Sequence, residues 1–428
     1  MTAKTQEAVQ ENQTEPAPRA GLVMAILFLI FFLGTTDNQV IGVLLPFIAA
    51  DLGVEAGRAG ALIGPAYALA AAAAAFFIGS ISDRFGRRRF LVIATVVFGC
   101  SLLAVSLMSN LNAIAAVRLS TGLAAGTFST CSIAYVAVYF PYSRRGVAMS
   151  IVQAGYFAAL VIGVSAALFL ATKQSWRMSF VLFGVLSLIA FAAVFALLPE
   201  DRHLLAKRDA GLSASRRFDN IRTAFERVDR IASIIAAFCV SCGFVGFYFY
   251  LTSWLKGSIG LSAGQIYLFF VLVGCAALIA SVLAGPVADK FGKRSISIIS
   301  SLVLASMLVL IPSLNWGAML FVSFLAASLA FAFRQGPLQA LATELVPAHT
   351  RGALVAVRNT ASQVGIAVST GLSGWLYDRY GYWAVGLFCG SVTLAAAACI
   401  GLMKEPRQAE AERANDAPGR SRDGLVEE

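Results

Sequence analysis

Charged residues are scarce in this sequence, and histidine is almost absent. Of the 428 residues, 13% are charged and 58% are hydrophobic, a balance far too apolar for a soluble globular domain. The two histidines, His203 and His349, fall in stretches that we expect to be loops. We find no paired acids and no nucleophile beside a base, so the sequence does not point to an enzyme.

Cysteine is infrequent and shows neither the spacing of a disulfide framework nor that of a metal site. All the cysteines lie in apolar runs, where the expected role is that of a small buried side chain: Cys100, Cys131, Cys239, Cys242, Cys275, Cys389 and Cys399. A phosphate loop is absent too, because GPVADKFGK (285–293) has six residues rather than four between its glycines. We therefore expect no cofactor and no metal.

Long apolar runs, in contrast, recur along the whole chain. A bilayer core needs about 20 apolar residues per helix, and unbroken runs favour helices over alternating barrel strands. We expect an all-α membrane protein with twelve transmembrane helices, approximately Leu22–Ile48, Arg58–Ser80, Phe90–Met108, Asn112–Val138, Val147–Ala171, Met178–Leu198, Ile231–Leu255, Ala263–Val287, Ile296–Leu314, Gly317–Leu345, Ala353–Leu376 and Tyr382–Met403.

One long loop divides these helices into two sets of six. We expect a six-helix bundle at 21–198, a cytoplasmic linker at 199–230 and a second bundle at 231–404. Residues 1–20 and 405–428 are polar and are expected to be disordered cytoplasmic tails. Nothing before Gly21 resembles a cleavable signal peptide, so the first helix is expected to stay as an anchor.

The net charge of +10 is concentrated in the loops of one side. When alternate loops are assigned to opposite sides, one side holds Arg87, Arg88, Arg145, Lys290 and the basic linker, and the other holds few basic residues. The positive-inside rule then places both termini and the linker in the cytoplasm, with the protein in the cell (inner) membrane. The charge thus sets topology, and we expect no nucleic-acid partner.

Several residues repeat at one offset. Asp83 and Asp289 are 206 residues apart, and the same offset joins Pro141 to Pro347, Arg145 to Arg351 and Gly146 to Gly352. This predicts two parallel six-helix repeats, an arrangement in which transporters place their site at the midplane between the halves.

The loop GSISDRFGRRR (79–89) matches GxxxD(R/K)xG(R/K)(R/K), and GPVADKFGKRS (285–295) repeats it in the second half. Arg118, Gly122 and Gly126 in RLSTGLAAG, and Trp176, Arg177 and Phe180, follow a similar family pattern. On these motifs the chain resembles transporters of the major facilitator superfamily over residues 21–404.

The resemblance implies a cytoplasmic gate. Gly79 and Asp83 share one helix face, where the carboxylate can accept hydrogen bonds from the N-terminal amides of a neighbouring helix. The gate residues that the two loops imply are Gly79, Asp83, Arg84, Gly86, Arg87, Gly285, Asp289, Lys290 and Gly292.

The branch of the family stays open at this point. Drug/proton antiporters usually carry Gly-Pro in helix five, where this chain has no proline, whereas Asp37, Gly42 and Pro46 are spaced as in organic-acid/proton symporters. The expected function is proton-coupled transport of a small organic solute by alternating access. The alternatives are an efflux antiporter and, on the same scaffold, a lipid flippase or a signalling receptor.

The stretch GTTDNQ (34–39) puts consecutive polar residues inside the first helix, which must be enclosed or broken there. Asp37 lies roughly 22 Å from the cytoplasmic end, and an ionisable residue at that depth is expected to be functional. Its expected partner is Arg118 in helix four. Asp37 and Arg118 are therefore candidates for proton coupling, the alternative being a static ion pair.

The second half contributes Arg334 in helix ten and Arg358 in helix eleven. Glu344 could pair with Arg358 or Arg351. If it neutralises Arg358, Arg334 is left without a partner and favours an anionic or neutral polar substrate. We expect a monomer that binds this substrate and protons within the bilayer. The candidate cavity residues are Asn38, Gln39, Arg334, Gln335, Arg358, Tyr67, Tyr156 and Tyr250, with Tyr248 and Trp254 as further wall residues.

Overall fold

The computed structural model describes residues 19–140, 142–201, 225–346 and 351–403, and every regular element in these ranges is a helix. The first half consists of α2 (Ala20–Leu52), α3 (Ala56–Phe85), α4 (Arg87–Leu107), α5 (Leu111–Tyr139), α6 (Tyr142–Ala158), the π-helix η1 (Ala159–Gly163), α7 (Val164–Lys173) and α8 (Trp176–Leu197). The second consists of α11 (Val228–Gly257), α12 (Ala263–Phe291), α13 (Lys293–Leu310), the 3₁₀ turn η2 (Ile311–Ser313), α14 (Ala318–Glu344), α15 (Arg351–Tyr380) and α16 (Tyr382–Gly401).

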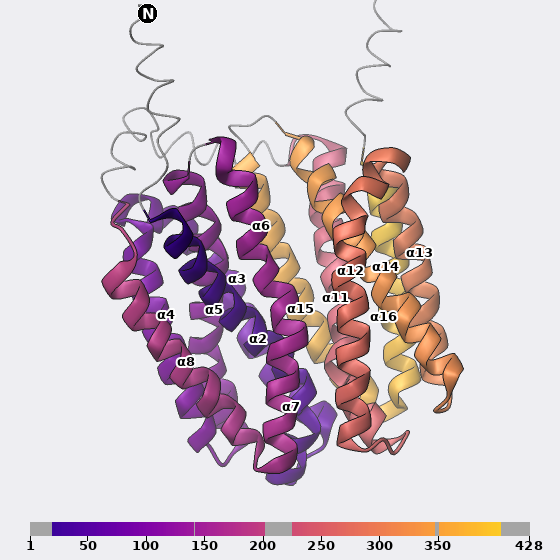
Figure 1. The fold of residues 1–428 in the computed structure, drawn as a ribbon. Helices are drawn as coiled ribbons and strands as arrows, with labels where there is room; N and C mark the ends of the chain where they lie inside the picture. The colour runs from indigo at the N-terminus through magenta and orange to yellow at the C-terminus, as the bar shows by residue number, and fades with distance from the viewer. Residues whose placement is uncertain (1–18, 141, 202–224, 347–350, 404–428) are drawn as a thin grey trace, which may run out of the picture.

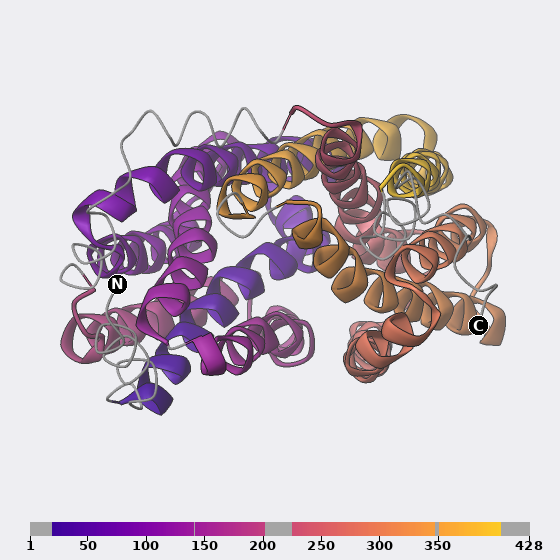
Figure 2. The same cartoon turned by 90° about the horizontal axis from the view of Figure 1, so that it is seen from above.

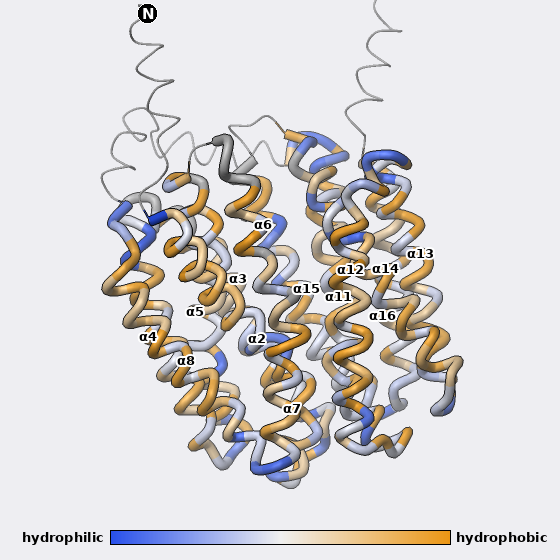
Figure 3. Tube along the Cα trace, viewed as in Figure 1, coloured by the Kyte–Doolittle hydropathy of each residue, from blue (hydrophilic) through white to orange (hydrophobic). Residues whose placement is uncertain are grey.

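These helices have the length and composition of membrane spans. Ten spans in the described residues are long and apolar enough to cross a bilayer, with α6, η1 and α7 forming one of them. Helices α5 and α15, of 29 and 30 residues, run alongside and complete the expected twelve. Figure 3 shows apolar residues along the middle of the helices and polar residues gathered at their ends.

The polar stretch of the first helix is enclosed rather than broken. Helix α2 continues through residues 34–39, with Thr36 and Asp37 buried. The π-helix η1 was not expected, and it packs where α2 passes the fifth span: a Cβ on Gly163 would lie 2.5 Å from the side chain of Thr36.

The helices form two groups, α2 to α8 and α11 to α16, as the view in Figure 2 shows. We call the end of the bundle that carries residues 19 and 403 the inner end, and the opposite end the outer end (Figure 1). The exact bounds of the two halves remain a prediction. The predicted tails and most of the linker lie outside the described residues.

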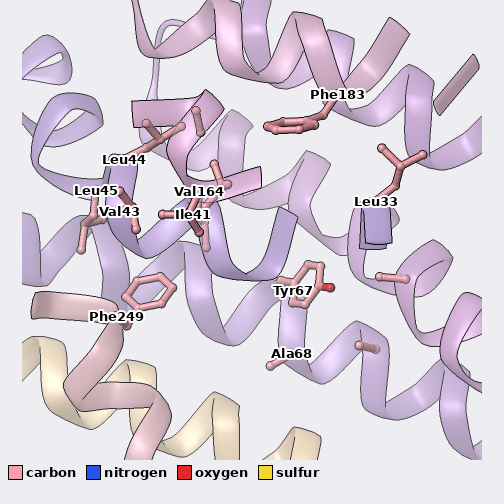
Figure 4. Close-up of a cluster of buried hydrophobic side chains, with 14 of the residues drawn as sticks. Leu33, Ile41, Val43, Leu44, Leu45, Tyr67, Ala68, Val164, Phe183 and Phe249 are labelled. Atoms are coloured by element: carbon pink, nitrogen blue, oxygen red, sulfur yellow. The ribbon is translucent and has the colours of Figure 1, made fainter. Parts of the chain in front are cut away.

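Apolar packing joins the halves from the middle to the outer end. The largest buried cluster contains most of the first half together with Phe249, Leu255 and Tyr382 from outer parts of the second half. Figure 4 shows Phe249 of α11 beside Val43 of α2, and a Cβ on Gly42 would lie 2.9 Å from the Cα atom of Phe249. At the inner end, the second half has a separate cluster made by α11, α14 and α16.

Candidate functional site

Asp37 of α2 and Arg118 of α5 form a buried ion pair. The Arg118 Nη1 atom donates to Oδ1 and Oδ2 of Asp37 at 2.6 and 2.7 Å, and the residues are 2% and 0% exposed. The guanidinium lies 4.5 Å from the ring centroid of Tyr67, a cation–π distance. The pairing expected from the sequence is therefore present, and its role in proton coupling remains a prediction.

Two glycines bring Arg118 to this place. Arg118, Gly122 and Gly126 follow one another at intervals of four, which places them on one face of α5. A Cβ on Gly122 would lie 2.9 Å from the backbone carbon of Tyr67, and one on Gly126 would lie 2.8 Å from the Cβ of Ala74. The glycines thus let α5 approach the backbone of α3, which sets the Tyr67 ring over the guanidinium.

A cavity of about 70 Å³ lies between the halves. This volume corresponds to roughly two water molecules, so in this conformation it is smaller than an organic substrate needs. Its first-half wall is Gln39, Tyr156 and Leu160. The second-half wall is strongly aromatic: Phe244, Phe247, Tyr248, Leu251, Phe269, Phe270, Val273, Gly274, Ala277, Leu308, Phe324, Ala327, Ser328 and Phe331.

Arg334 lies next to this cavity and has no hydrogen-bonding partner within the described part of the chain. It is 0% exposed, and Nε, Nη1 and Nη2 are all unpaired there. Its Cζ atom is 5.9 Å from the ring centroid of Phe331, and it interacts electrostatically with Tyr156. Since Phe331 and Tyr156 both line the cavity, a buried cation for which the described residues supply no counter-charge lies behind its wall.

Some of the candidate cavity residues lie elsewhere. Gln39, Tyr156 and Tyr248 line the cavity, whereas Asn38 and Gln335 are not among its lining residues. The other aromatic candidates are taken up by packing: Tyr67 lies on Arg118, Tyr250 donates to the Thr370 carbonyl at 2.8 Å, and Trp254 stacks on Tyr382. These three pack within the helices here, which is the alternative to a place in the cavity wall, and a role for them in the substrate cavity remains a prediction.

The pairing of Glu344 with Arg358, one of the two that the sequence suggested, is wrong. Glu344 forms its ion pair with Lys293, at the start of α13, because α14 ends beside that turn. Arg358 is buried two turns into α15, and it donates to the Ser233 carbonyl at 3.3 Å and to Gln339 Oε1 at 3.2 Å. The Arg351 side chain lies outside the described residues.

The first gate loop is described only in part. Gly79, Asp83 and Arg84 belong to α3, but the surroundings of Gly79 and the side chains of Asp83 and Arg84 are not among the features that the structure describes. The Arg87 Nη1 atom donates to the Ala134 carbonyl at 2.8 Å, within the first half. Gly86, like Gly292 in the second loop, turns the chain with φ near +90°, which only glycine adopts without strain. Gly285, Asp289 and Lys290 lie in the last turns of α12. The gate itself remains a prediction.

Asp201 is a residue that sequence reasoning missed. Its carboxylate is 1% exposed and accepts the backbone N–H groups of Arg87 at 2.9 Å and Arg88 at 3.3 Å. It therefore caps the N-terminus of α4, although it lies much later in the sequence, just after the last helix of the first half. The only available signal was an aspartate directly after the sixth span.

A family model described as Major Facilitator Superfamily matches residues 27–278 and 234–425, nearly the whole chain. The chain belongs to the Major Facilitator Superfamily. It is a multi-pass membrane transporter and not an enzyme, and both the resemblance noted in the motifs and the all-α fold are confirmed.

Similar proteins within the superfamily include bacterial transporters. An uncharacterized MFS-type transporter of Bacillus subtilis is 26% identical over 74% of this chain and 78% of its own length. A cis,cis-muconate transport protein of Acinetobacter baylyi is 23% identical over 82% of this chain and 86% of its own. The crystal structure of a D-xylose-proton symporter superposes with a TM-score of 0.73 over 90% of this chain and 97% of that chain, at 22% identity, which establishes a shared fold.

Proposed function

We propose that this transporter moves a small organic anion across the cell (inner) membrane by alternating access, coupled to protons. The observation that carries the proposal is Arg334, a fully buried arginine without a hydrogen-bonding partner in the described residues. A buried charge is costly unless an opposite charge meets it. A carboxylate can do so through two parallel hydrogen bonds to the guanidinium.

The wall of the cavity supports a substrate with both an acidic and an apolar part. Phe244, Phe270 and Phe331 offer aromatic faces, and Gln39 and Tyr156 offer hydrogen-bonding groups on the opposite side. The similar muconate transport protein is named for a dicarboxylate, which fits an anion site. The same positive charge disfavours the lipophilic cations that many efflux antiporters carry, since like charges repel across a low-dielectric cavity.

Proton coupling is assigned to Asp37 and Arg118. Protonation of Asp37 would break the ion pair and release Arg118, so the pair has two states that differ in charge. The distribution of basic loops supports cytoplasmic termini. In this proposal the protein works as a monomer, because each half supplies one wall of the cavity within a single chain.

The test is uptake of radiolabelled cis,cis-muconate into proteoliposomes, with organic acids, neutral sugars and ethidium as competitors. We expect acids to compete and ethidium to have no effect. Arg334→Gln should abolish uptake, whereas the matched variant Arg177→Gln should retain it, because Arg177 lies at the outer surface and pairs with Asp51. Uptake that survives in Arg334→Gln, or ethidium transport driven by a pH gradient, would contradict the proposal.

A further inference from the structure

One hydrogen bond at the outer end reaches from one half to the helix terminus of the other. The backbone N–H of Gly57, at the start of α3, donates to Oδ1 of Asp378, near the end of α15, at 2.8 Å. Because α3 runs inward and α15 runs outward, the C-terminal part of α15 meets the N-terminus of α3. The Asp378 carboxylate of the second half thus contacts the N-terminus of α3 in the first half.

Helix α3 has no cap of its own at this terminus. The residue before it, Glu55, makes no side-chain capping bond, and the first turn contains no acidic residue but does contain Arg58. The free N–H groups and the partial positive charge of a helix N-terminus favour a carboxylate. Asp378 provides one, and it also interacts with the backbone of Arg58.

Close packing ties this contact to one arrangement of the halves. A Cβ on Gly57 would overlap the Asp378 carboxyl group and the Gly374 carbonyl, and a Cβ on Gly374 would overlap the Tyr250 hydroxyl. Tyr250 in turn donates to the Thr370 carbonyl of α15. The carboxylate therefore reaches the α3 terminus only while the outer ends are packed together.

We propose that Asp378 is a positioning residue of the transport cycle, which caps α3 from the opposite half and thereby holds the outer side closed. Opening that side breaks the hydrogen bond and leaves the α3 terminus to water, so Asp378 biases the inward–outward equilibrium without touching the substrate. It is the outer counterpart of the contact that the sequence predicts for Asp83, at the opposite end of the same helix.

The test measures the outer distance between the halves in the full-length protein in lipid nanodiscs. Spin labels are attached to cysteines at Ser109 and Asn315, exposed residues of outer loops in the two halves, in a background without the seven native cysteines. Asp378→Asn keeps an acceptor for the Gly57 N–H group but loses the carboxylate charge that strengthens the capping bond. This loss should raise the ratio of outer-open to outer-closed molecules roughly two- to fivefold.

Asp51→Asn is the matched control, because Asp51 is an outer aspartate whose partner, Arg177, belongs to the same half at 2.7 Å. We expect its distance distribution to equal that of the wild type. An unchanged distribution in Asp378→Asn, or the same shift in Asp51→Asn, would overturn the proposal. If Asp378→Asn does not fold, Gly57→Ala replaces it, because its methyl group excludes the carboxylate; an unshifted distribution there overturns the proposal equally.

Discussion

Replacing each of two buried arginines with methionine should change stability in opposite directions. Arg334→Met replaces a guanidinium that has no hydrogen-bonding partner in the described residues with an unbranched apolar side chain. In Arg118→Met, the Asp37 carboxylate, 2% exposed, loses the only ion-pair partner that the described residues give it. The two changes are chemically identical, so their surroundings alone set the sign.

The magnitudes follow from the cost of buried charge. Replacing even a buried ion pair by well-packed apolar groups is often neutral or stabilising by about 1–4 kcal/mol, and a buried charge without a partner has no pair attraction to lose. Breaking a buried pair costs about 3–5 kcal/mol. We therefore expect Arg334→Met to raise the free energy of unfolding of the ligand-free protein and Arg118→Met to lower it. A substrate anion at 100 times its Kd should stabilise the wild type by about 2.7 kcal/mol, and Arg334→Met by almost nothing.

Reversible denaturant unfolding of both variants in the same detergent measures these differences, with and without muconate. If Arg334→Met loses as much stability as Arg118→Met, Arg334 has a partner in the native protein and the argument for an anion site fails. If both variants still gain stability from the anion, the anion binds elsewhere.

Three further predictions test other parts of the site. Asp37→Asn, which cannot titrate, should abolish substrate accumulation driven by a pH difference while sparing substrate exchange; accumulation that persists in proteoliposomes places the proton site elsewhere. Gly122→Val should destabilise the protein by more than about 2 kcal/mol through overpacking against the Tyr67 backbone, and unfolding at wild-type denaturant concentrations would rule that out. Glu344→Gln should change the free energy of unfolding by less than about 1 kcal/mol, because the Glu344 and Lys293 side chains are 34% and 27% exposed. A larger decrease in that free energy would indicate that Glu344 has a buried ionic partner.

The fold could be predicted from the sequence because the local composition of each segment shows whether it is a membrane span. Each apolar run is long enough to cross the bilayer as one helix, which pairs its backbone hydrogen-bonding groups internally. The repeated loops indicated that the two halves are parallel six-helix repeats. The π-helix at Ala159–Gly163 escaped prediction because its sequence, ALVIG, resembles the other apolar runs of the chain and carries no signal of a local change in helix type. It lies where Gly163 packs closely against Thr36 of α2, a tertiary contact that the local sequence does not reveal.

Ion pairs could be predicted from the sequence only where a charged residue had a single candidate partner at the same depth in the membrane. Asp37 is the one carboxylate predicted at mid-depth, so Arg118 had a single candidate partner, and the structure contains that pair. Glu344 had several basic residues within reach of the inner end, and depth estimates could not separate Lys293 from Arg358. Aromatic cavity residues such as Phe270 and Phe331 were missed, because a phenylalanine in an apolar helix gives no signal of which face it occupies.

The arrangement of α2 gives a physical basis for the proposed coupling between a proton site at Asp37 and a substrate cavity that does not touch it. Asp37 faces Arg118 inside the first half, whereas Gln39 faces the cavity between the halves. Two residues along a helix point about 200° apart, so the two sites occupy opposite faces of the same rigid rod. In this proposal, neutralising Asp37 breaks its ion pair with Arg118 of α5, and any shift of α2 that follows moves Gln39 relative to Tyr156. The Thr36 contact with the π-helix lies between these faces, so we expect the fifth span to respond to the same displacement.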